Sequence, residues 1–172
     1  AGNERSGIAF VGGMSWFPNA DALEYFALDI LPLIRARDAQ VTVTWVGRAS
    51  RADIERYARE GITLTGLVDD IRPYVDRAAC YVVPLRIGGG TRLKILDAWA
   101  LGKALVSTSI GCEGLAAEDG KNMLVRDDPQ SFAAAVMTVM RDSGLRASLE
   151  RNGRLTAEQK YMISTARRFE WP

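Results

Sequence analysis

The sequence predicts an α/β fold, a doubly wound and mostly parallel sheet of about six strands with helices on both faces. Short apolar runs rich in β-branched residues alternate with longer stretches in which apolar residues recur at helical spacing. Strands and helices that alternate in this way are typical of a parallel sheet with right-handed crossovers. At 172 residues the chain can build one domain whose core needs neither disulfides nor a metal.

Six apolar runs have the length and the residue types of buried strands. In chain order they are Ile8–Val11, Val41–Val46, Ile62–Thr65, Tyr81–Leu85, Ala104–Thr108 and Met123–Val125. In an open parallel sheet the ligand crevice lies outside the carboxyl ends of the strands. We therefore expect Arg48, which follows the second run, to point over that crevice. Glu113, in the loop after the fifth run, either faces a ligand or is only solvated.

Six stretches have helical spacing, and most of them have a recognisable start or end. They run from Asn19 through Ile34, from about Ser50 to Arg59, from Asp69 or Asp70 to Ala78, from Thr91 to Leu101, from Pro129 through Met140 and over Leu145–Trp171. Asn19 and Asp69 or Asp70 are the predicted caps of their helices, and Pro129 stands at a favourable early position. Gly102 is placed to end its helix in a left-handed conformation.

The stretch Cys80–Ser109 carries the strongest functional signal. Its strand is followed by Gly88–Gly90 and then by a helix with Arg92 and Lys94 in the first turn. A helix N-terminus has unpaired backbone N–H groups and about half a positive charge, and glycines let an anion approach the backbone. Two mobile cations there oppose the helix dipole unless an anion offsets the repulsion. The pattern predicts a phosphate site; the alternative is a flexible loop before a solvated basic turn.

Asp97 lies further along the same helix. An acidic residue near a nucleotide phosphate site commonly accepts hydrogen bonds from ribose hydroxyls. Asp97 is therefore a candidate ribose ligand, and the alternative is an exposed helix carboxylate.

Composition excludes several classes of protein. The chain has no histidine, which rules out Ser-His-Asp and Cys-His catalysis and the usual zinc sites. Its net charge of +1, with acids and bases interspersed, argues against a nucleic-acid partner. Cys80 and Cys112 lack metal-ligand spacing and fit reduced thiols. No apolar run has the length of a membrane span and no signal peptide opens the chain, so we expect a cytoplasmic location.

Two further kinds of site are not expected. Counting a dinucleotide fingerprint from Gly12 places Met14 and Phe17 where its second and third glycines belong, so an NAD site loses its main support. No metal is implied, because the acids of the pairs Asp69–Asp70 and Asp127–Asp128 are adjacent and no D-x-D cluster occurs.

Four segments together resemble the C-terminal, nucleotide-sugar-binding domain of GT-B glycosyltransferases, most closely the family-4 retaining enzymes. They are FVGGMSWFPNADAL, VTWVGR, TLTGLVDDIRPYV and, the most specific, VVPLRIGGGTRLKILDAWALGKALVSTSIGCEGL. The resemblance covers nearly the whole chain and implies the Rossmann-like half of a GT-B fold. It implies a sugar transfer, with retention, from a UDP- or GDP-sugar in glycan or polysaccharide biosynthesis, and no cofactor.

The resemblance also implies which residues contact the donor. The matching positions are Gly12, Gly13, Leu67, Val68, Gly89, Gly90, Thr91, Arg92, Leu93 and Asp97. Two matching cations, Arg48 and Lys94, neutralise the diphosphate and take the catalytic role of stabilising it as a leaving group. In the family the base rests against the loop matching Leu67–Asp70, and the acid matching Asp97 holds the ribose.

The sequence departs from the family at two of these positions. Asp97 stands where the family usually has glutamate, which shortens the carboxylate by one methylene. Gly89 replaces the family's other glutamate, eight residues earlier. These departures leave open a second interpretation, a catalytically inactive nucleotide-binding or interaction domain of the same fold.

The resemblance further implies a larger protein. We interpret residues 1–7 as a linker, 8–160 as the donor-binding domain and 161–172 as a helical tail that packs toward an N-terminal domain outside this sequence. That domain would bind the acceptor, a sugar or a lipid-linked glycan, and the full-length protein would associate peripherally with a membrane. The present domain alone should bind nucleotide and transfer little sugar.

Overall fold

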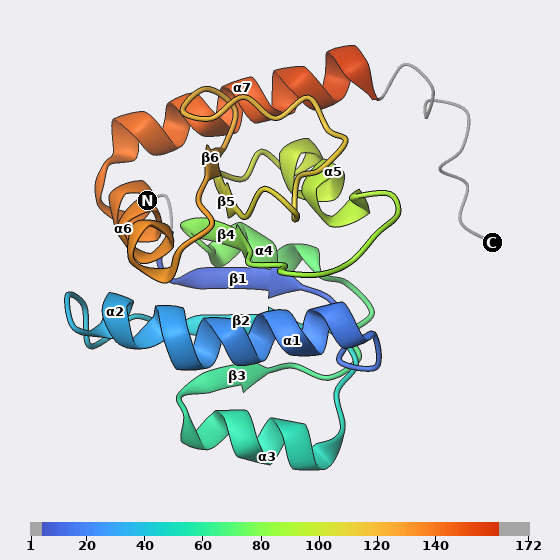
Figure 1. The fold of residues 1–172 in the computed structure, drawn as a ribbon, viewed down its shortest axis with the longest axis vertical. Helices are drawn as coiled ribbons and strands as arrows, with labels where there is room; N and C mark the ends of the chain where they lie inside the picture. The colour runs from blue at the N-terminus through green and yellow to red at the C-terminus, as the bar shows by residue number, and fades with distance from the viewer. Residues whose placement is uncertain (1–4, 162–172) are drawn as a thin grey trace.

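The computed structural model describes residues 5–161, which form one six-stranded sheet flanked by helices (Figure 1). The strands are β1 (Ile8–Val11), β2 (Val43–Val46), β3 (Ile62–Leu64), β4 (Cys80–Val83), β5 (Leu105–Ser107) and β6 (Leu124–Val125). Their order is β3-β2-β1-β4-β5-β6, and all neighbouring strands are parallel. The predicted fold class is confirmed, and each predicted strand overlaps an observed one.

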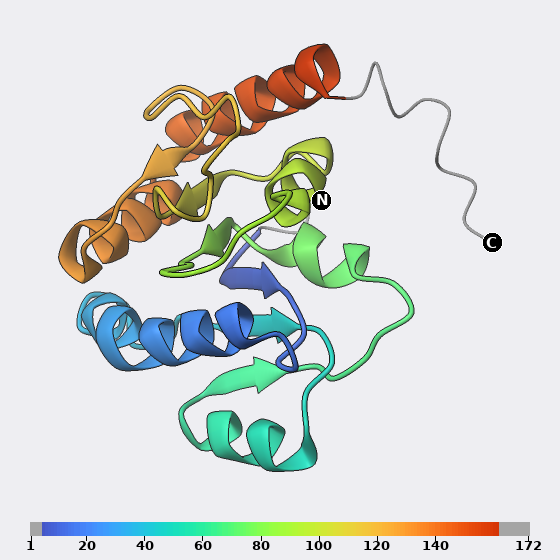
Figure 2. The same ribbon diagram turned by 45° about the vertical axis from the view of Figure 1, so that its right-hand side comes forward.

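Helices cover the sheet on both faces and follow the strands in the alternation that the sequence predicts. They are α1 (Phe17–Tyr25), η1 (Phe26–Ile30), α2 (Leu31–Arg35), α3 (Arg51–Arg59), α4 (Arg72–Arg77), α5 (Leu93–Ala100), α6 (Pro129–Arg141) and α7 (Ser143–Lys160). α1, η1 and α2 follow one another directly. α6 packs on η1, α2, β4 and β5, and α7 packs on α5. Both views show α3 beside β3 and α7 at the other end of the molecule (Figures 1 and 2).

Asn19 is not the cap of the first helix. α1 begins at Phe17, its N-cap is Trp16 with an extended backbone, and Asn19 is the third helical residue. Pro18 explains the earlier start, because proline has a helical φ and lacks an N–H, and both features suit a first turn. The side chain of Asn19 is thereby freed from capping and lies buried, with 4% exposure.

The other predicted helix boundaries agree better with the structure. Ser50 caps α3 in a capping box with Asp53, and Asp128 caps α6. Neither Asp69 nor Asp70 is the N-cap of α4, which is Ile71, but the Asp70 carboxylate accepts the backbone N–H of Arg72 at 2.9 Å. Gly102 has the expected positive φ of 64° after α5. Residues 162–172, which include most of the predicted tail, lie outside the described residues.

Aromatic side chains fill the core on either side of the sheet. The rings of Phe10 and Trp45 stack with their centroids 3.8 Å apart. Trp99 is fully buried on α5 and donates its indole N–H to the carbonyl of Asn122 at 3.0 Å. This contact anchors α5, whose first turn carries the predicted phosphate site, to the long loop before β6. Within residues 5–161 no helix is long and apolar enough to cross a membrane.

Candidate functional site

The loops that follow β1 and β2 are in direct backbone contact at the carboxyl edge of the sheet. Gly12 N–H donates to Val46 C=O at 2.8 Å, and Met14 N–H donates to Arg48 C=O at 2.7 Å. A Cβ on Gly47 would lie 2.7 Å from the carbonyl carbon of Gly12, closer than real Cβ contacts come. The two loops therefore fit together only because glycines stand where their backbones meet.

Lys94 enters this edge from the second position of α5. Its Nζ donates to Asn19 Oδ1 at 3.1 Å and lies 4.9 Å from the ring centre of Trp16 and 5.4 Å from that of Phe10. Burial, and secondarily the charge of Arg92, lower the pKa of Lys94 from its ordinary value to about 8. The ammonium is thus partly stripped of water, which strengthens its attraction for an anion at the start of α5.

Arg92 is not the mobile cation that its position in the sequence predicts. Its side chain is only 4% exposed, and Nη2 donates both to Gly88 C=O at 3.2 Å and to Glu113 Oε2 at 3.1 Å. Its Nε is buried and has no hydrogen-bond partner among the described residues. The guanidinium therefore links the loop after β4, through Gly88, to the loop after β5, through Glu113.

The glycine loop between β4 and α5 is open where the sequence predicts a phosphate. Gly88 and Gly90 have positive φ angles of 131° and 85°, which side-chain-bearing residues adopt only with strain. Gly89 does not have a positive φ, and a Cβ built on it would meet no atom within 4 Å. Packing therefore does not require glycine at position 89, and a longer side chain would meet no obstacle at its Cβ.

Asp97 and Lys94, both on α5, line the same half-enclosed cavity of about 210 Å³. Its lining residues are Val11, Ile71, Val75, Tyr81, Leu93, Lys94, Asp97, Ala98 and Leu101. Burial raises the pKa of the Asp97 carboxyl, although the residue as a whole lies at the exposed rim.

A second, more open hollow of about 700 Å³ adjoins the first through Asp97. It is lined by Asp69, Asp70, Ile71, Arg72, Asp97, Ala100 and Leu101. The predicted base-contacting residues Leu67 and Val68 are not in this lining, and Leu67 is 73% exposed. The two aspartates that follow them in the same loop line the hollow instead.

Arg48 lies beside the loop after β1. A Cβ on Gly13 would lie 3.6 Å from the carbonyl oxygen of Arg48, so the two residues are neighbours. Arg48 is exposed, and none of residues 5–161 pairs with its guanidinium. Thr91 and Leu93, the last two predicted contacts, are also exposed, at the start of α5. The structure thus gathers Gly12, Gly13, Arg48 and the stretch 89–97 around one edge.

The sequence pattern does not identify Asn19 as a residue of this site. Asn19 was expected to cap a helix, yet it bridges α1 and α5. It falls on the same helical face as Leu23 and Phe26, which are fully buried. A polar side chain within such an apolar stripe must find buried partners, and that requirement is the signal that could have identified it.

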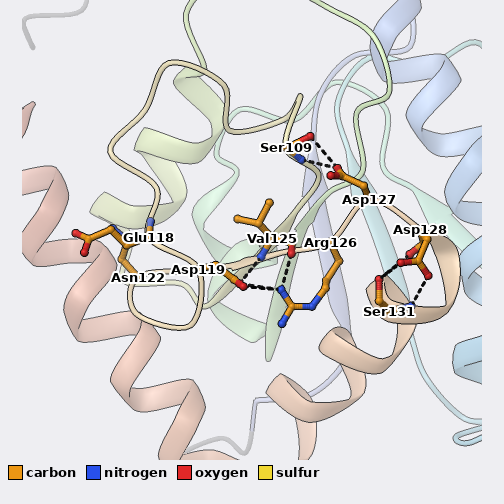
Figure 3. A network of polar contacts seen from close by, with 9 residues as sticks. All are labelled: Ser109, Glu118, Asp119, Asn122, Val125, Arg126, Asp127, Asp128 and Ser131. Atoms are coloured by element: carbon orange, nitrogen blue, oxygen red, sulfur yellow. Dashed lines mark hydrogen bonds and ion pairs between the residues drawn. The ribbon is translucent and has the colours of Figure 1, made fainter.

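On the β6 side of the edge, carboxylates are engaged in holding loops together (Figure 3). Asp127 Oδ1 accepts the N–H and the hydroxyl of Ser109 at 2.8 and 2.9 Å, which joins the loops after β5 and β6. Asp119 pairs with Arg126 at 2.8 Å. Within residues 5–161 no group of three or more His, Cys, Asp or Glu side chains is placed to hold a metal ion.

A shifted pKa alone does not identify a site in this protein. Lys103 precedes β5 at the opposite, amino edge of the sheet, is 1% exposed and has its pKa lowered to about 8 by burial. Its Nζ donates to Asp76 C=O at 3.2 Å, in the last turn of α4, where a cation complements the helix dipole. Lys103 is therefore structural, whereas Lys94 faces a cavity beside other candidate ligands.

Residues 5–142 match the model of a protein family described as glycosyl transferases group 1. The chain belongs to the group 1 glycosyltransferases. Among curated proteins it is similar to an uncharacterized 44.6 kDa protein in the cps region of Klebsiella pneumoniae, with 25% identity over 149 residues. That match covers 81% of this chain and 38% of the Klebsiella protein.

Solved glycosyltransferase structures share the fold. Staphylococcus aureus TarM, in a complex that contains UDP, superposes with a TM-score of 0.78 at 17% identity over 95% of this chain and 34% of TarM. Anabaena HepE with UDP and glucose gives 0.73 at 18% identity, over 94% of this chain and 46% of HepE. The C-terminal domain of a Francisella tularensis group 1 glycosyltransferase, LpcC, gives 0.69 at 18% identity, over 91% of this chain and 88% of that domain. These likenesses confirm the Rossmann-like GT-B domain.

The chain spans less than half of the Klebsiella protein, of TarM and of HepE. It corresponds to one domain of such proteins.

Proposed function

We propose that this domain binds the nucleotide-diphosphate sugar of a retaining glycosyltransferase, with the diphosphate at the start of α5. The observation that carries the proposal is that Lys94 and Asp97, both on α5, line one cavity. A half-buried ammonium suits a diphosphate, and a carboxylate one turn further along the helix suits the ribose hydroxyls.

The chemistry that this arrangement supplies is electrostatic. When the sugar leaves the donor, negative charge develops on the diphosphate. Lys94 and the backbone N–H groups at the start of α5 are oriented before the reaction and stabilise that charge, and the exposed Arg48 adds a second cation. No imidazole is needed, which agrees with a chain that contains no histidine. Arg92 contributes indirectly by fixing the glycine loop through Gly88.

UDP is the favoured nucleotide. TarM and HepE, which share the fold, were both solved with UDP. We place the full-length protein in the cytoplasm and in glycan or polysaccharide biosynthesis, which fits a relative encoded in a cps region. The acceptor would be bound by protein outside this chain, so the domain alone should bind donor and transfer little sugar.

Titration calorimetry with UDP, GDP, ADP and NAD tests the proposal on the domain itself. We expect UDP to bind, with GDP second, and NAD not to bind. Glucose 1-phosphate serves as the control for a site that recognises only phosphate. Failure of every nucleoside diphosphate to bind would contradict the assignment of the donor site.

A catalytically inactive, nucleotide-binding domain is the second candidate, and the open space at Gly89 is the observation that favours it. The loop lacks a carboxylate although packing would accept one. Transfer assays on the full-length protein decide between the candidates. UDP binding without turnover of any UDP-sugar, by hydrolysis or by transfer, would favour the inactive domain.

UDP binding is expected to weaken as the pH rises through about 8. Because the pKa of Lys94 is lowered to about 8, the free domain loses this proton just above neutrality, and a diphosphate binds the ammonium rather than the amine. The affinity for UDP is therefore highest below about pH 8, where Lys94 is protonated, and falls by up to about tenfold per pH unit above it. Calorimetry between about pH 7 and 9 measures this, since phosphate groups with a second pKa of about 6 are already ionised there. A flat profile for the wild-type domain would contradict it.

A further inference from the structure

Asn19 is a buried polar residue that joins three parts of the candidate site. It lies in the first turn of α1 with 4% exposure. Its Nδ2 donates to Gly13 C=O at 2.9 Å, and its Oδ1 accepts from Lys94 Nζ at 3.1 Å. The amide therefore links the loop after β1, the helix α1 and the first turn of α5.

The contact is close and leaves little freedom to either side chain. A Cβ on Gly12 would lie 2.6 Å from Asn19 Nδ2, so this backbone packs directly on the amide. The Lys94 ammonium is held near the rings of Trp16 and Phe10. Among the described residues, the hydrogen-bond acceptor of Lys94 Nζ is Asn19 Oδ1.

The charged groups around Lys94 do not neutralise it. Arg92, just before α5, adds a second positive charge. Asp97 and Tyr81 line the same cavity, but neither is hydrogen-bonded to the ammonium. The Asp21 carboxylate on α1 is engaged by Arg86, at 2.6 and 3.1 Å. Lys94 is thus oriented by a neutral amide while its charge remains available to a ligand.

We propose that Asn19 is a positioning residue, which holds the Lys94 ammonium toward the donor diphosphate without neutralising it. The inference rests on the proposed function, because it assigns Lys94 to the diphosphate. An aspartate here would have the same shape, but its charge would form an ion pair with Lys94 and compete with the phosphate. A side chain without an acceptor would leave the ammonium free to choose other orientations, at an entropic cost on binding.

A double-mutant cycle tests whether Asn19 acts through Lys94. Asn19→Ala, Lys94→Met and the double variant are titrated with UDP at about pH 7. We expect Asn19→Ala to weaken UDP binding by about tenfold in the wild-type background, as for loss of a hydrogen bond to a charged group. In the Lys94→Met background it should change the affinity by about twofold or less, because the ammonium through which Asn19 acts is then absent.

Asn19→Asp supplies a second, isosteric test with a distinct readout. The new carboxylate should weaken UDP binding at about pH 7 by roughly tenfold or more. It should also move the fall in affinity to higher pH, because a neighbouring negative charge raises the pKa of Lys94. An unmoved pH profile would show that the side chain at position 19 does not act on the Lys94 ammonium.

Asn122 provides the matched control. It is 1% exposed and its amide also joins segments, bonding Glu118 N–H, Ala116 C=O and Thr156 Oγ1. Asn122→Ala should lower the melting temperature and leave the affinity of the folded domain for UDP unchanged.

The outcomes separate the inference from the function on which it rests. An Asn19→Ala effect of the same size in both backgrounds would overturn the role of Asn19, because it would then act through Gly13 and the loop after β1. An unmoved pH profile in Asn19→Asp would do the same. If the wild-type domain does not bind UDP at all, both the inference and the donor site fail.

Discussion

Replacing Lys94 with methionine is expected to weaken UDP binding by about 30- to 100-fold at neutral pH, the effect of losing one charged hydrogen bond in a partly desolvated site. Methionine preserves the apolar stem that packs near Trp16 and Phe10 while removing the ammonium. The melting temperature should change little. Burial of the charge disfavours the folded state, and its removal compensates for the hydrogen bond that Asn19 loses. Calorimetry with UDP and a thermal melt measure the two quantities.

Lys121→Met is the control for the change of net charge. Lys121 is 64% exposed and pairs with Glu118 in the loop before β6. The Lys121→Met variant should bind UDP with the affinity of the wild-type domain. If Lys94→Met bound UDP as tightly as Lys121→Met does, Lys94 would have no part in a diphosphate site, whatever its position in the cavity.

Gly47→Ala is expected to lower the free energy of unfolding by about 3 kcal/mol or more, from overpacking and backbone strain together. Its φ is 146°, and the new Cβ would lie 2.7 Å from the carbonyl carbon and oxygen of Gly12 and 2.9 Å from Gly13 N. These are backbone atoms and cannot rotate away. For a domain of this size the melting temperature should fall by about 6 to 12 °C. UDP binding should also weaken, because the loop after β1 must move.

Gly66→Ala is the control that distinguishes the steric overlap of the new Cβ from the cost of a positive φ. Gly66 also has a positive φ, of 73°, but the nearest atom to its Cβ would be Ile54 Cδ1 at 3.9 Å. We expect a loss of about 1 to 2 kcal/mol from the left-handed conformation alone, and unchanged UDP binding. Equal destabilisation by the two substitutions in urea or thermal unfolding would show that contact with Gly12 is not what requires glycine at position 47.

The sequence by itself determined the fold class, the six strands and most helix boundaries. These follow from local rules: buried parallel strands are continuous apolar runs, and caps such as Ser50 and Asp128 act on N–H groups a few residues away. The glycine loop before α5 was recognised for the same reason. Its signal is the adjacency of a strand end, three glycines and a helix start in one stretch of chain.

Tertiary structure alone decided how the side chains of the site are used. Arg92 and Lys94 are equivalent basic residues in the sequence, but Arg92 is buried against Glu113 while Lys94 meets Asn19 at the cavity. These partners lie 21 and 75 residues away in the chain. The direction of a long cationic side chain depends on which acceptors the packed loops bring within reach. Local pattern carries no information about those acceptors, because they come together only when β1, β4 and β5 lie side by side in the sheet.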